Sequence, residues 1–255
     1  MNTTRFTFKD FTKVFGLSIG LTALFLGLFS AFPGAGTFMN GIHPSLSFIL
    51  AYVVQFAILF FPLWLFVVDK YNANLSDFGF TKIGTGKLLK NVFLVYGAYL
   101  LFALAFGILI QFLGLEIPGY GQQDSYVPLF GDDSLGLMVG IFFVVFVAPF
   151  VEELYFRGFV YRVFTKEWPV WIGSIMTAAV FAFVHFQFSS FVPLFIVGLF
   201  LNWVYQRTQS VWASIGVHMI NNAVAFGVSL YVASHPELLE ELDLITGLIY
   251  NTLTL

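Results

Sequence analysis

The sequence predicts an all-α polytopic membrane protein with about seven transmembrane helices, and three observations support this fold class. First, 59% of the 255 residues are hydrophobic and only 10% are charged, whereas soluble domains carry about 25% charged residues. Second, several apolar runs reach roughly 18 residues, the length that crosses a bilayer as a helix. Third, basic residues gather in alternate connections between these runs, as the positive-inside rule requires of a membrane protein.

The apolar runs divide into seven spans that form one transmembrane domain over residues 1–255. Their order along the chain is Val14–Phe32, Leu46–Val68, Val92–Leu113, Leu135–Tyr161, Pro169–Phe186, Phe191–Tyr205 and Val211–Ala233. The first span is longer than the apolar core of a signal peptide, about 7–15 residues, so we expect it to be retained. Residues 234–255 form an acidic tail, whose last part, Leu244–Leu255, is too short to span and is expected as a short interfacial eighth helix.

The connections between spans predict the orientation. Lys and Arg residues precede span one, lie between spans two and three, follow span four, and lie between spans six and seven. The connections 33–45, 114–134 and 187–190 contain neither residue, and the C-terminal tail also lacks them. We therefore expect a cytoplasmic N-terminus and an external C-terminus.

Composition also excludes several kinds of chemistry and partner. A net charge of −3 gives no indication of nucleic-acid binding. The absence of cysteine excludes disulfides, thiolate nucleophiles and cysteine-based metal sites together.

Span four carries three charged residues in an otherwise apolar run, APFVEELYFRGF. Charges inside a bilayer are costly and usually functional. Glu153 and Arg157 are four residues apart, so they share a helical face and are expected to pair. Glu152 lies about 100° around the helix, with Phe156 at its own i+4 position, and therefore needs another partner.

The expected partners of Glu152 lie in spans five and seven. His185 ends FAFVHF, and His218 and Asn222 lie four apart on one face of span seven. A carboxylate and an imidazole can deprotonate water, while a second imidazole and a carboxamide can stabilise an oxyanion. Alternatively, Glu152, His185 and His218 could be three ligands of a catalytic divalent metal such as zinc, with an open fourth position.

These groups meet only if the helices are suitably placed. Counting at about 1.5 Å per residue from the cytoplasmic ends puts Glu152 about 15 Å deep and His185 nearer 24 Å. We expect helix tilt, or a span five that starts below the interface, to remove this difference of about 10 Å.

Three motifs resemble those of the CAAX-protease and bacteriocin-processing (CPBP, or Abi) family of intramembrane proteases. APFVEELYFRG resembles the family's EExxxR motif, FAFVH its FxxxH motif, and SVWASIGVHMINN its third motif, in which Asn follows His by four residues. All three occur in the family's order, within a core of about residues 135–233. The resemblance implies that the catalytic helices lie in the C-terminal half of the chain.

The resemblance implies an intramembrane endopeptidase that hydrolyses membrane-associated proteins or peptides, of the metallo- or the glutamate type. Glu152 and His185 correspond to the water-activating pair, His218 and Asn222 to oxyanion stabilisers or further ligands, and Glu153 and Arg157 to the supporting ion pair. We accordingly expect an integral protein of a bacterial plasma membrane.

Two non-enzymatic functions are alternatives. A membrane scaffold or bacteriocin-immunity protein could keep the family fold without turnover, although every motif position here retains its functional residue type. A proton or ion transporter could use Glu152 and His185 as a relay, but transporters of this kind usually show inverted repeats, which the sequence lacks.

Overall fold

The structure is a computed structural model, which describes residues 4–118, 127–131 and 133–235. All regular elements in these residues are helical, which confirms the predicted fold class. The longer α-helices are α1 (Phe8–Ala31), α3 (Pro44–Leu63), α4 (Thr85–Leu113), α8 (Val170–Val184), α9 (Phe191–Thr208) and α10 (Val211–Ser234). The shorter ones are α2 (Pro33–Gly41), α5 (Ser134–Gly140), α6 (Ala148–Tyr155) and α7 (Tyr161–Glu167).

Three π-helical segments and three short 3-10 turns complete the described fold. The π segments are η1 (Trp64–Asp69), which extends α3, and η4 (Ile141–Val147) and η5 (Phe156–Val160), which join α5, α6 and α7 into one rod. The 3-10 turns are η2 (Leu75–Phe78), η3 (Val127–Leu129) and η6 (Phe188–Ser190). The rod from Ser134 to Glu167 is the fourth predicted span, lengthened at its C-terminal end by one helical turn and a half.

Six helical segments in the described part of the chain are long and apolar enough to cross a membrane. The remaining predicted span, around Pro169–Phe186, is present as α8, which has only 15 residues and ends at Val184. A helix of 15 residues is about 22 Å long, so α8 falls short of the hydrocarbon core, which is about 30 Å thick.

The connection at residues 33–45 contains a helix that the sequence did not predict. Pro33 starts α2 at its first turn, where a missing N–H costs no hydrogen bond. Phe32 before it is extended (φ −110°, ψ 90°), which separates α2 from α1. The predicted interfacial helix at Leu244–Leu255 lies outside the described residues.

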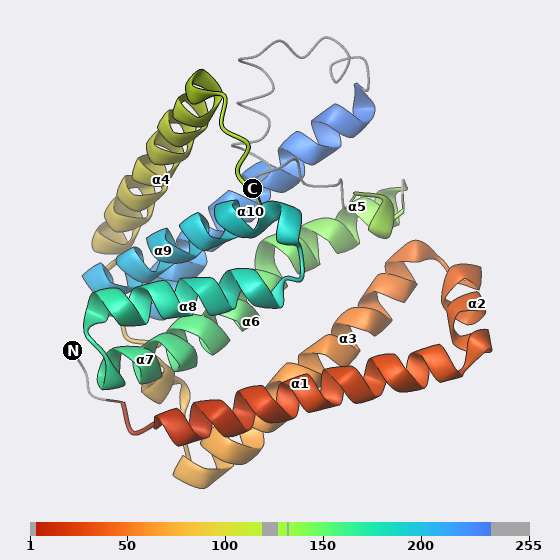
Figure 1. Cartoon of the computed structure of the whole chain (residues 1–255), viewed down its shortest axis with the longest axis horizontal. Coiled ribbons are helices and arrows are strands. Elements are labelled where there is room, and N and C mark those ends of the chain that lie inside the picture. The colour runs from red at the N-terminus through yellow and green to blue at the C-terminus, as the bar shows by residue number, and fades with distance from the viewer. Residues whose placement is uncertain (1–3, 119–126, 132, 236–255) are drawn as a thin grey trace.

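The rod is the central element of the arrangement (Figure 1). The hairpin of α1 and α3, joined by α2, packs against one side of the rod, and α8 and α9 lie side by side on the other. Helix α10 packs along α6 and η4, while α4 contacts α9 and α10 on the side away from the hairpin. Phe159, Val160 and Val163 of the rod are fully buried in the main apolar core. The rod therefore contacts each of the helices that carry the predicted histidines.

Candidate active site

The charged pair predicted in span four is present and fully buried. Nη1 of Arg157 donates to Oε1 of Glu153 at 2.7 Å, and both side chains are 0% exposed. Such a pair is stable in an apolar interior only when its remaining donors also find acceptors.

Arg157 finds those acceptors on α9. Its Nε donates to Oδ1 of Asn202 at 3.1 Å, and its Nη2 donates to the carbonyl of Gly198 at 2.9 Å. Asn202 in turn donates to the carbonyl of Ser174 on α8 at 2.9 Å. The guanidinium also lies over the ring of Phe181, 4.9 Å from its centroid. One arginine thus connects the rod to α8 and α9.

Sequence reasoning did not find Asn202 or Phe181 as part of this arrangement. Asn202 is a polar residue in an apolar span, which was a usable signal because such residues rarely face lipid. Phe181 opens the FAFVH motif, and its ring lies 4.7 Å from that of His185 and 5.9 Å from that of His218. Its ring therefore contacts the guanidinium of Arg157 as well as both histidines.

Glu153 has a second partner that the i,i+4 argument could not supply. Nδ1 of His218 lies 2.9 Å from the same Oε1 atom that accepts from Arg157. His218 is only 5% exposed and comes from α10. Because an ionised carboxylate only accepts hydrogen bonds, Nδ1 of His218 carries the hydrogen. The supporting pair therefore also orients a predicted catalytic residue.

Glu152 lies against both histidines. Its Oε2 atom is 3.7 Å from Nε2 of His185 and 3.9 Å from Nε2 of His218. This oxygen is buried and has no hydrogen-bond partner, although the side chain as a whole is 25% exposed. The expectation that Glu152 and His185 come within reach of one another is confirmed.

Both histidines face Glu152 with their Nε2 atoms. Nδ1 of His185 lies 2.6 Å from the carbonyl of Phe181, which can only accept, so Nδ1 of His185 is also a donor. In their neutral forms, both rings therefore present an Nε2 lone pair to Oε2 of Glu152. Three acceptor atoms that converge in this way require a proton, a water molecule or a cation between them.

This atom set fits a divalent metal in its chemistry. A metal-ligating histidine commonly donates its other N–H to a carboxylate or a carbonyl, which is what Glu153 and Phe181 provide here. Ligands of a tetrahedral zinc lie about 3.3 Å apart, given Zn–N distances of about 2.0–2.1 Å. The observed 3.7 and 3.9 Å are slightly wider, and the described part of the chain contains no group of three or more His, Cys, Asp or Glu with the arrangement of a metal site.

Asn222 is engaged by the backbone of the rod. Its Nδ2 donates to the carbonyl of Val144 at 2.9 Å. At the end of η4, the N–H of Ala148 bonds five residues back, to Phe143. The next such donor would belong to Pro149, which has no N–H, so the carbonyl of Val144 loses its π-helical partner. Asn222 supplies the missing donor and keeps one further N–H for another acceptor.

The two π segments bracket the site. Helix α6, which carries Glu152 and Glu153, lies between η4 and η5, and Arg157 is in η5. Segments of π-helix inside α-helices are rare and occur frequently at functional sites. Sequence periodicity could not predict them, because a π insertion changes the register by a single residue.

The comparisons with known proteins match the same region of the chain. A family model described as Type II CAAX prenyl endopeptidase Rce1-like matches residues 134–224. An uncharacterized 24.3 kDa protein of Escherichia coli is 27% identical over 119 residues, which are 44% of this chain and 54% of that protein. The match thus spans about half the length of this curated relative. No solved structure gives a significant match to the chain.

The matched segment begins with the rod at Ser134 and continues into α10, so it includes all six predicted site residues. The family description is that of an endopeptidase, which favours peptide-bond hydrolysis at a membrane as the general class of activity. The segment 134–224 is therefore similar to the Rce1-like family of Type II CAAX prenyl endopeptidases.

Proposed function

We propose that this protein is an intramembrane endopeptidase that hydrolyses peptide bonds of membrane-associated proteins or peptides, with Glu152 as its general base. The observation that carries the proposal is the buried Oε2 atom of Glu152, which has no hydrogen-bond partner and faces the Nε2 atoms of His185 and His218. A buried carboxylate oxygen without a partner is costly, and a reacting water molecule would satisfy it.

In this mechanism Glu152 takes a proton from a water molecule held between its carboxylate and Nε2 of His185. The resulting hydroxide adds to the carbonyl carbon of the scissile peptide bond, and the carbonyl oxygen becomes an oxyanion. Glu152 then returns its proton to the departing amine as the C–N bond breaks. The carbonyl of Phe181 holds the His185 ring in the orientation that this step needs.

His218 and Asn222 are assigned to the oxyanion. Nε2 of His218 can donate to an oxyanion only when it carries a proton, and the carboxylate of Glu153 at Nδ1 would balance the resulting charge. Asn222 has one N–H left after its bond to Val144. Donors fixed by the protein before the reaction stabilise developing charge without reorganisation.

The same residues could hold a divalent cation. Glu152, His185 and His218 would be its ligands, and a bound cation would polarise the substrate carbonyl and lower the pKa of a bound water. Elemental analysis of the purified protein separates the two versions. If wild type contains about one equivalent of metal and the His185→Ala and His218→Ala variants contain none, the enzyme uses a metal. If the active protein contains no metal, Glu152 activates the water directly.

Mass-spectrometric profiling of protein termini tests the function. Cells carrying wild type are compared with cells carrying Glu152→Gln, and Glu116→Gln, in the connection after α4, serves as the matched control. We expect new termini with wild type and with Glu116→Gln that vanish with Glu152→Gln. Identical profiles from well-expressed proteins would exclude proteolysis and favour the scaffold or immunity function.

A further inference from the structure

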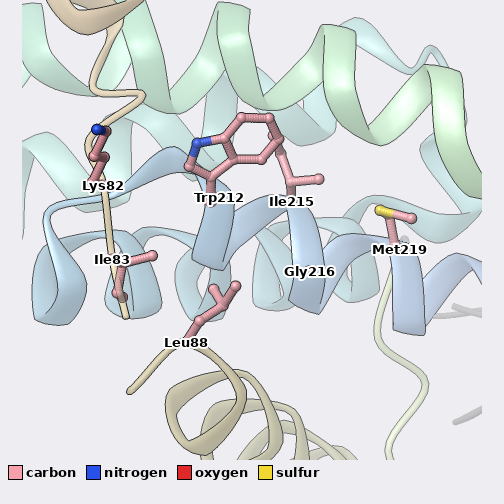
Figure 2. Close-up of a pocket in the computed structure, with 7 residues that line it drawn as sticks. All are labelled: Lys82, Ile83, Leu88, Trp212, Ile215, Gly216 and Met219. Carbon is pink, nitrogen blue, oxygen red and sulfur yellow. The ribbon is translucent and has the colours of Figure 1, made fainter. Parts of the chain in front are cut away.

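A hollow lies outside the proposed active site, where two spans begin next to each other. It is formed by the linker that precedes α4, the first turn of α4, and the first turns of α10 (Figure 2). Its lining includes Lys82, Ile83, Leu88, Trp212, Ile215 and Met219. We refer to these six residues as the lysine groove.

The lysine groove is separate from the catalytic residues but adjacent to them. Trp212, Ile215 and Met219 have helical spacing and form one side of α10. His218 and Asn222 lie roughly a quarter of a turn away around the same helix. An occupant of the groove would therefore contact the helix that carries the proposed oxyanion donors without touching Glu152.

The linker that forms the groove wall is held in place. The N–H of Val211 donates to the carbonyl of Gly79 at 3.0 Å. Ser210 donates its hydroxyl to the carbonyl of Thr81 at 2.8 Å, and the Thr81 hydroxyl donates to the carbonyl of Gln209 at 2.7 Å. Three hydrogen bonds thus fix the linker to the turn between α9 and α10, so the groove is formed before any ligand arrives.

The inner side of the groove is closed by direct contact between α4 and α10. A Cβ atom placed on Gly216 would lie 3.0 Å from Cγ2 of Val92. Only glycine allows this approach without displacing the Val92 side chain. The groove is therefore open toward the outside of the helix bundle and closed toward its core.

The charge of this region has one sign. Lys82 is exposed at the end of the groove where α4 begins, and its side chain is the one charged group in the lining. Lys87, Lys90 and Arg207 are exposed near the same helix ends. Residues 78–115 and 168–235, which include the linker, α4, α9 and α10, contain no Asp or Glu. A ligand with a negative charge at one end complements this arrangement.

The apolar part of the groove runs from the membrane interface toward the membrane interior, as the acyl chain of a lipid does. Trp212 lies at the start of a span and packs edge-on against Phe80, with ring centroids 5.2 Å apart, the position that interfacial tryptophans favour. Met219 is seven residues further along α10, about 10 Å deeper. A molecule with its charge near Lys82 and an apolar chain directed toward Met219 matches both ends.

We propose that the lysine groove binds an anionic phospholipid of the surrounding membrane. The lipid phosphate contacts Lys82 at the interface, and one acyl chain lies along Leu88, Ile215 and Met219. A zwitterionic lipid presents the same chain but carries a compensating positive charge in its headgroup, so the groove prefers the anionic lipid.

Native mass spectrometry of the intact chain released from detergent tests this preference. The protein is mixed with equal amounts of phosphatidylglycerol and phosphatidylcholine that have the same acyl chains. We expect phosphatidylglycerol to be retained in preference, and Lys82→Ala to lower this preference about fivefold, the effect of one cation near a membrane surface. Lys9→Ala, which removes an exposed lysine of α1, is the matched control and should change nothing.

A second variant separates the site from diffuse electrostatic attraction. Leu88→Trp fills the groove, so it should reduce the retention of both lipids. Equal retention of the two lipids by wild type, or an equal loss of preference in Lys82→Ala and Lys9→Ala, would refute the site. A dimer that Leu88→Trp dissociates would also overturn it, because the groove would then be covered by a second copy. None of these readouts depends on proteolytic activity.

Discussion

Two glutamates that are neighbours in sequence are placed in different surroundings. Glu153 is fully buried and shared between Arg157 and His218. Glu152 has a buried oxygen without a partner and a side chain that is 25% exposed. The helix turns by about 100° between them, which is enough to separate a supporting carboxylate from a reacting one.

Single substitutions should separate these roles by stability. Glu153→Gln leaves Arg157 as an uncompensated buried charge, and we expect it to destabilise the protein by about 3–5 kcal/mol. Glu152→Gln removes a charge that has no fixed partner, so its melting temperature in detergent should stay close to that of wild type. Similar losses in the two variants would contradict the proposed difference.

The hydrogen bond from Asn222 to the carbonyl of Val144 leads to a separate prediction, because Pro149 has no N–H to donate to that carbonyl. Asn222→Ala leaves the carbonyl of Val144 without a donor, which should cost about 1–3 kcal/mol. In a Pro149→Ala background, residue 149 gains an N–H and can donate to Val144 itself. The cost of Asn222→Ala should then be smaller by about 1 kcal/mol in a double-mutant cycle. Additive effects would show that Pro149 does not create the need for Asn222.

The start of the rod is held by a capping aspartate. Asp133 accepts from the N–H of Gly136 at 2.8 Å, as the N-cap of α5. Nδ1 of His43 accepts from the N–H of Ser45, so its Nε2 can donate to Asp133, 3.2 Å away. This cap fixes the end of the rod that is farther from α7 and joins it to the start of α3.

The cap predicts a pH dependence. The hydrogen bond from the Gly136 N–H holds the pKa of Asp133 below its usual value of 3.8. A carboxylate with a lowered pKa stabilises the fold above its unfolded-state pKa, and this contribution disappears as the pH falls through the folded-state value. The melting-temperature difference between wild type and Asp133→Asn should therefore be largest near about pH 6 and shrink toward about pH 3. A constant difference would mean that ionisation of Asp133 does not matter.

Elements were predictable from the sequence where the signal is local. Apolar length located each span, and four-residue spacing paired Glu153 with Arg157, because both depend on a single helix. The contact of His218 with Glu153 and that of Asn222 with Val144 join residues 65 and 78 positions apart. No periodicity encodes such distances. Helix α2 was missed because the Gly-rich run after Pro33 resembles a connection.

For the whole molecule, a single buried arginine holds several elements together. Arg157 contacts Asn202 and Gly198 of α9 and the ring of Phe181 in α8, while its partner Glu153 contacts His218 of α10. The helices that position the proposed catalytic residues are therefore joined through one charged centre. Span four, the longest of the candidate spans, carries this centre.

The orientation of the whole chain in the membrane can be tested cleanly because the protein has no cysteine. The distribution of Lys and Arg predicts that α2 lies outside and that η2 lies in the cytoplasm. Asn40→Cys in α2 and Ser76→Cys in η2 both place a thiol at an exposed position. A membrane-impermeant maleimide should label Asn40→Cys in intact cells, and it should label Ser76→Cys only after the membrane is opened. The reverse pattern would invert the predicted topology and place the lysine groove in the outer leaflet.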